Sequence, residues 1–205
     1  AFAGRPQVDI EGALLNADIL GSFFTLGGRA AYLYGWEPTW LDREPHCDSW
    51  GNNALFLADG ERRIRYRVAT YYGARLAIAS WFDSAGGPHE VHPAHSDLRD
   101  TAGHELVTAY AVRRPGGGWS VMVINKDPNR SHAVRVDFRG AGRLERPFAG
   151  RIRLSMYSRA QYRWHPQGSR GYPDPDLPPA TSERDASELI AMPPYSLAVI
   201  RGVVR

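Results

Sequence analysis

The first third of the chain places apolar residues at helical spacing, then in one unbroken run. Asp9 precedes a stretch whose apolar residues recur every three or four positions up to Leu26, and Gly27-Gly28 follow directly. An Asp before such a stretch and glycines after it are typical helix caps, so the pattern predicts a helix. Ala30–Tyr34 then contains no charged residue, which predicts a short strand covered on both faces, as in a parallel sheet.

A second helix is predicted beyond the long polar loop LDREPHCDSWGNN. Residues 65–83 carry two apolar rows at helical spacing, one of which includes Val68, Tyr72 and Leu76. A helix with two such rows packs against a sheet and a neighbouring helix. A single helix–strand–helix unit leaves its buried strand without a ladder partner, and each unpaired buried backbone group costs about 1–3 kcal/mol. Residues 1–95 are therefore predicted to be part of something larger.

From His104 onward the apolar period becomes two. ELVTAYAVRR and WSVMVINK flank the turn PGGG and predict a hairpin, while residues 132–140, 151–158 and 195–204 predict further strands. Strands at this spacing with Gly and Pro turns are typical of an antiparallel β-sandwich, assigned here to residues 96–205. The segment YRWHPQGSRGYPDPDLPPATSE has no period and is expected to be an ordered loop packed on the first part of the chain.

Charge and composition exclude some partners. The net charge is +3, and 24 of the 25 basic residues are arginines, spread along the chain except for the group at 62–67. No basic stripe accompanies a recognisable nucleic-acid motif, so no nucleic-acid partner is expected. No apolar run reaches the roughly 18 residues that cross a bilayer, so no membrane partner is expected either. Ala1 is expected to be a processed or a cut end, and the compartment stays open.

Metal and cofactor chemistry find little support in the residue pattern. The lone Cys47 excludes an internal disulfide and a cysteine-based zinc site. The histidines of HEVHPAH are spaced by three, but Pro93 prevents the helix that would bring them to one face. His46 and Asp48 flank Cys47, far from these histidines in the sequence, and do not complete a ligand set. No metal and no cofactor are therefore predicted.

Taken in order, these segments resemble the C-terminal portion of retaining glycoside hydrolases. The similarity is to (β/α)8-barrel enzymes followed by a small β-sandwich, related to β-xylosidases, α-L-arabinofuranosidases and endoglucanases. YLYGWEP is similar to their eighth barrel strand and VMVINKDP to their sandwich hairpin. The resemblance implies a fold of α/β plus all-β type: the end of a barrel over residues 1–95 and a β-sandwich over 96–205.

The resemblance also implies where substrate binds. Active sites of such barrels lie at the C-terminal ends of the strands. A Trp at the end of strand eight commonly forms the floor of a sugar subsite, a role that falls here to Trp36. Glu37, Trp50 and Asn52 are expected to contact an oligo- or polysaccharide from the same cleft. As alternatives, Trp36 closes the sheet as a core residue, Glu37 pairs with an arginine or caps a loop, and Trp50 and Asn52 belong to an ordinary turn.

The catalytic residues are not expected in this chain. Hydrolysis with retention of the anomeric configuration requires two carboxylates about 5–5.5 Å apart. In the family these two residues lie at the ends of barrel strands four and seven. The chain begins after strand seven would have ended, so no catalytic residue is assigned and the isolated chain is expected to be inactive. The missing N-terminal barrel portion is then expected as a covalent or companion partner. Two other hypotheses stay open: a carbohydrate-binding β-sandwich module without catalytic activity, and a structural domain without any ligand.

Overall fold

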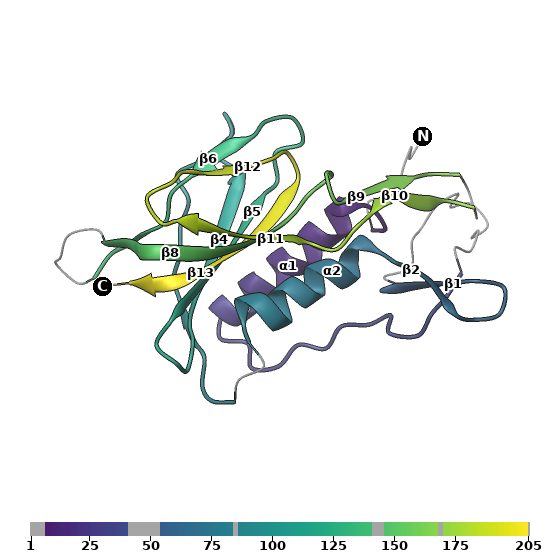
Figure 1. Cartoon of the computed structure of the whole chain (residues 1–205), viewed down its shortest axis with the longest axis horizontal. Coiled ribbons are helices and arrows are strands. Elements are labelled where there is room, and N and C mark those ends of the chain that lie inside the picture. Colours follow the sequence, from purple (N-terminus) through teal and green to yellow (C-terminus); the bar gives the residue numbers. More distant parts are fainter. Residues whose placement is uncertain (1–6, 41–53, 84–85, 141–145, 168–169, 205) are drawn as a thin grey trace.

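Two helices lie side by side against one face of a large antiparallel sheet (Figure 1). The computed structural model describes residues 7–40, 54–83, 86–140, 146–167 and 170–204. The helical elements are α1 (Ile10–Thr25), α2 (Ala69–Arg75) and the π-helical turn η1 (Leu76–Trp81). The strands are β1 (Phe56–Ala58), β2 (Ile64–Arg67), β3 (Glu90–His92), β4 (Val107–Arg113), β5 (Trp119–Asn125), β6 (His132–Val134), β7 (Asp137–Phe138), β8 (Arg146–Tyr157), β9 (Tyr162–His165), β10 (Tyr172–Asp176), β11 (Ala180–Asp185), β12 (Ile190–Met192) and β13 (Ser196–Val204).

The predicted first helix is confirmed. The Asp9 carboxylate accepts the Ile10 amide hydrogen at 2.8 Å and caps the start of α1. The chain leaves the helix through Gly27, which has φ +91° and so takes the left-handed conformation that a glycine adopts without strain. No helix within the described residues is both long and apolar enough to span a bilayer.

The second predicted helix begins later than expected. Residues 64–67 form β2, which pairs with β1 in an antiparallel hairpin, and α2 starts only at Ala69. The alternation of Arg65, Tyr66 and Arg67 suits an exposed strand as well as a helix, and the hairpin partner decides between the two. The two helices meet at Gly73, where an added Cβ would lie 2.7 Å from the Ala13 carbonyl oxygen.

The β-rich half is built on a seven-stranded sheet. Its order is β11-β8-β13-β5-β4-β3, with β7 paired to β8, and every pairing is antiparallel. The predicted hairpin is present as β4 and β5, and the predicted strands at 151–158 and 195–204 overlap β8 and β13, each extending one residue beyond the observed strand. The expected strand at 132–140 is divided: β6 pairs with β12 in a small second sheet, and β7 joins β8.

Two segments expected to be irregular contain strands. The stretch 162–183 holds β9 and β10, paired as a hairpin, and most of β11, which pairs with β8 at the sheet edge. All six side chains of β11 are exposed, so an edge strand of this kind leaves no apolar period in the sequence. At the predicted division near residue 95, where no element was predicted, β3 pairs with β4.

Apolar side chains cover both faces of the central strands. One cluster joins the helices to Tyr110, Met122 and Leu197, and the opposite face packs Val121 and Ile200 against the small second sheet. Alternate residues of β4, β5 and β13 thus enter different cores, as the period of two requires. The helices and the sheet share the first core, and the division of the chain at residue 95 stays a prediction.

The expected strand at Ala30–Tyr34 does not form. Among the described residues no strand pairs with this segment, and it runs extended beside the helices toward β1 (Figure 1). Tyr32 is 94% exposed and Tyr34 is 78% exposed. A parallel strand needs a neighbour for its backbone hydrogen bonds, and the described part of the chain supplies none here. The structure therefore contains the curled antiparallel sheet, and the described residues by themselves do not form a (β/α)8 barrel.

Candidate functional site

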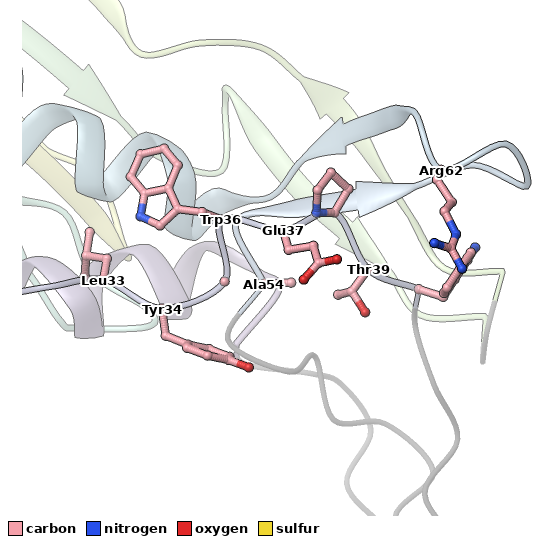
Figure 2. Close-up of a pocket in the computed structure, with 10 residues that line it drawn as sticks. Leu33, Tyr34, Trp36, Glu37, Thr39, Ala54 and Arg62 are labelled. Atoms are coloured by element: carbon pink, nitrogen blue, oxygen red, sulfur yellow. The ribbon is translucent and has the colours of Figure 1, made fainter.

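The extended segment ends in an open pocket of about 530 Å³ (Figure 2). Residues 33–40 form most of its lining, and Ala54 and Arg62 complete it from the β1–β2 side. Trp36 and Glu37, both predicted as substrate contacts, lie in this lining. Trp50 and Asn52, the other two predicted contacts, lie outside the described residues, as do His46, Cys47 and Asp48.

Backbone hydrogen bonds to β1 hold the lining in place. Gly35 has φ +92° and turns the chain, and its carbonyl accepts the Leu55 amide hydrogen at 3.0 Å. Thr39 donates its amide hydrogen to the Phe56 carbonyl at 3.2 Å and accepts that of Ala58 at 2.8 Å. The segment from Trp36 to Pro38 is therefore fixed at both ends, and its side chains are displayed on an anchored loop.

Two tryptophans present indole surface to solvent at this pocket. Trp36 is 57% exposed and Trp40 is 45% exposed. Trp36 also packs against Phe56, with 6.1 Å between ring centroids. An exposed indole that is supported from behind offers a flat apolar face to the C–H groups of a sugar ring. The alternative that Trp36 is a core residue closing a sheet does not fit this exposure.

Glu37 is exposed, and Figure 2 shows its carboxylate directed away from Trp36, toward the side of Thr39. No ion pair joins Glu37 to an arginine within the ranges that the structure describes. An ionised carboxylate only accepts hydrogen bonds, so Glu37 is suited to bind sugar hydroxyl groups. Glu37 is the one acidic side chain among the described residues of the lining. Hydrolysis by a general acid and a nucleophile needs two carboxyl groups, so Glu37 alone does not form a catalytic pair.

Two lining residues were not predicted from the sequence. Trp40 was not singled out, and Arg62 was noted only as a member of the arginine group at 62–67. The guanidinium carbon of Arg62 lies 5.8 Å from the centroid of the Trp40 ring. The dipeptide Asp59-Gly60 is a signal for a hairpin turn, and its placement before the arginines could have indicated that Arg62 belongs to a hairpin.

The histidines of the segment around Pro93 make separate contacts. His89 Nε2 lies 3.3 Å from Asp83, and His92 Nε2 lies 3.6 Å from Glu90. Asp83 also pairs with Arg201 at 3.0 Å, so its carboxylate already neutralises a cation. No group of three or more His, Cys, Asp or Glu side chains that could hold a metal occurs in the part of the chain that the structure describes.

The sequence matches no family model, and it matches no curated protein. Solved structures do resemble this fold. The GH51 arabinofuranosidase from Xanthomonas axonopodis pv. citri aligns with a TM-score of 0.52 and 14% identity over 96% of this chain and 36% of its own. The α-L-arabinofuranosidase from Thermotoga maritima, in complex with arabinose, aligns with a TM-score of 0.52 and 10% identity over 96% of this chain and 39% of its own.

At this identity the likeness shows a shared fold. The chain therefore has the fold of a portion of these two glycoside hydrolases, and it spans little more than a third of their length. Both helices and the antiparallel sheet fall inside the aligned region, since nearly the whole chain is covered. The fold expected from the resemblance in the sequence is thus supported without the barrel.

Proposed function

We propose that this chain is the C-terminal part of a glycoside hydrolase and that the pocket around Trp36 binds sugar rings of an oligo- or polysaccharide. The observation that carries the proposal is the supported, half-exposed indole of Trp36 beside the Glu37 carboxylate in an open pocket. An aromatic face next to an acceptor-only carboxylate complements the C–H face and the hydroxyl groups of a sugar. The shared fold with two arabinofuranosidases favours a carbohydrate over other ligands of similar shape.

The proposed chemistry is retaining hydrolysis by two carboxylates. One carboxyl group protonates the leaving oxygen, and the other attacks the anomeric carbon to form a glycosyl-enzyme that water then hydrolyses. Glu37 is not assigned to either role, because the described pocket residues supply no second carboxylate beside it. Both catalytic groups are proposed to lie upstream of this chain. Trp36 and Glu37 hold and orient the sugar, and the chain alone is inactive.

The missing barrel portion is proposed to cover the apolar surface that the chain exposes. Leu15, Ile19 and Phe23 are exposed along one side of α1 at the spacing of a single helical face, and the C-cap residue Leu26 is exposed just beyond them. The unpaired segment with Tyr32 and Tyr34 adds a second apolar area. A helix face and an extended segment together are what neighbouring α/β units of a barrel bury. The occupant is accordingly a covalent or companion polypeptide with parallel strands.

The coding region that precedes Ala1 tests this proposal first. We expect it to encode alternating strands and helices, with two strands that end in Glu. The complete product should then hydrolyse an arabinoxylan or a related plant polysaccharide, and replacing either Glu by Gln should abolish turnover. An upstream region without a barrel pattern would overturn the proposal.

A second function is favoured by the same exposed tryptophans. A carbohydrate-binding β-sandwich module would bind a polysaccharide through Trp36 and Trp40 without any catalytic partner. The two functions differ in turnover: the module binds sugar and hydrolyses nothing in any native assembly, whereas the hydrolase part is inactive only when it is isolated.

A further inference from the structure

Arg62 is positioned to hold an anion at one end of the pocket. Its guanidinium carbon lies 5.8 Å from the centroid of the Trp40 ring, and both side chains line the pocket that also holds Trp36 and Glu37 (Figure 2). A guanidinium in cation–π contact with an indole ring does not use its N–H donors in that contact. Those donors match a carboxylate in a bidentate arrangement. The Trp40–Arg62 pair therefore offers hydrogen-bond donors to a planar anion at the pocket edge.

The backbone of Arg62 takes the left-handed conformation where the β1–β2 turn ends, and its amide hydrogen is donated to the Asp59 carbonyl at 3.0 Å. Its φ is +62°, the left-handed region that favours glycine or asparagine. The turn itself is secured by Asp59, whose carboxylate accepts the amide hydrogens of Glu61 and Arg63 at 2.9 Å each. A left-handed residue at the end of a three-residue hairpin loop is an ordinary connection between antiparallel strands. The turn thus places the Arg62 guanidinium beside the pocket.

The positive charge of Arg62 is not neutralised by its described surroundings. The neighbouring Arg63 is paired with Asp59 at 3.0 Å and with Glu61 at 3.1 Å, whereas no ion pair joins Arg62 to any residue that the structure describes. The hairpin of residues 59–67 carries four arginines against two carboxylates. This surplus favours an anionic ligand on the hairpin side of the pocket, while Glu37 is the one carboxylate among the described lining residues.

From these observations we propose that the pocket prefers polysaccharides that bear uronic acids, with the sugar carboxylate bound by Arg62 and a sugar ring packed on Trp36. The inference rests on the proposed function and adds the chemical class of its substrate. A neutral polysaccharide leaves the donors of Arg62 to water. A uronate replaces that water with a charge-assisted, two-point contact, which a single tryptophan platform does not provide.

Affinity for a xylan that bears glucuronic acid, compared with the same xylan after its carboxyl groups are reduced, tests the inference. The protein is used as it occurs, with any covalent or companion polypeptide that it carries. We expect about tenfold tighter binding of the acidic polymer, since a charge-assisted contact is gained. Arg62→Gln should abolish that preference and leave binding of the reduced polymer unchanged. Arg62→Gly should do the same while raising the melting temperature, because glycine tolerates φ +62°.

Arg65→Gln is the matched control. Arg65 lies on the same hairpin, with its guanidinium carbon 4.9 Å from the centroid of the Tyr66 ring, but it does not line the pocket. Arg65→Gln removes one positive charge, as Arg62→Gln does, and should leave the preference for the acidic polymer intact. Equal binding of both polymers by the wild type, or equal losses in the two arginine variants, would overturn the inference alone. Absence of binding to either polymer would overturn the proposed function as well.

Discussion

The indole of Trp36 is inclined by 51° to the ring of Phe56, and their centroids lie 6.1 Å apart. Phe56 belongs to β1 and is buried, whereas Trp36 keeps more than half of its surface in contact with solvent. The pair thus connects the interior of the fold to the pocket. One ring supports and the other is displayed, so substitutions at the two positions should have different consequences.

Trp36→Ala is expected to weaken polysaccharide binding by about 1–3 kcal/mol, the range of an aromatic stacking contact. The fold should remain intact because the side chain is largely exposed, and the melting temperature should change by no more than about 2 °C. Phe56→Ala is the control, with a loss of stability of about 3–5 kcal/mol. Unchanged binding together with a lower melting temperature in Trp36→Ala would identify Trp36 as a core residue.

Trp81 tests whether helices and sheet unfold together. Its side chain is fully buried, and its Nε1 donates a hydrogen bond to the Tyr110 carbonyl oxygen at 2.9 Å, which links η1 to β4. Trp81→Ala should lower the free energy of unfolding by about 3–5 kcal/mol. Helical circular dichroism and the sheet signal should still be lost in one transition. Two separate transitions would instead indicate that residues 1–95 and 96–205 are independent folding units.

Gly73 tests the close approach of the two helices. A Cβ at this position would lie 2.7 Å from the Ala13 carbonyl oxygen and 2.9 Å from its Cα, both of which are backbone atoms. Gly73→Ala should therefore destabilise the protein by about 1–3 kcal/mol, despite the better helix propensity of alanine. Gly60→Ala is the matched control, because nothing lies within 4 Å of its added Cβ. Chemical denaturation of both variants measures the difference, and equal stabilities would contradict the observed helix packing.

Alkaline pH should destabilise the fold through its buried tyrosines. Burial, together with the hydrogen bond to Asp18 at 2.6 Å, raises the pKa of Tyr110 to about 12. Burial also raises the pKa of Tyr157 and of Tyr162. The unfolded chain therefore releases these protons first, and the free energy of unfolding should fall as pH rises from about 10 to about 12.

Absorbance of the phenolate at 295 nm, followed together with unfolding, measures this effect. Tyr110→Phe should be less stable at neutral pH, because it loses the bonds to Asp18 and to Ser22. It should also lose less stability between pH 10 and 12. Tyr32→Phe, at an exposed position, should change neither property. A wild type whose stability is flat over this range would contradict the burial of these phenols.

The elements that the sequence predicts well are those with a strong apolar period. α1 combines a capping Asp9 with regularly spaced apolar residues, and β4, β5 and β13 alternate between two cores. Elements without such a period were not predicted. β11 exposes every side chain at a sheet edge, and the β9–β10 hairpin includes several prolines, so neither has an apolar pattern to detect.

The candidate site was predictable only where it follows directly from the local sequence. Trp36 and Glu37 follow the apolar run Ala30–Tyr34 after the single residue Gly35, which drew attention to them. Arg62 reaches the pocket because the hairpin of β1 and β2 folds back on residue 40, a contact over more than twenty positions. Such a contact depends on tertiary structure, and no local pattern determines it.

The intact mass of the protein from its native source, recorded under denaturing and then native conditions, tests the central claim most directly. The account predicts a species larger than the 22.8 kDa of this chain, either one longer polypeptide or a complex with a chain that carries the remaining barrel strands. A folded, soluble species of 22.8 kDa alone would contradict the claim that the chain is part of a barrel hydrolase, and would favour the carbohydrate-binding module instead.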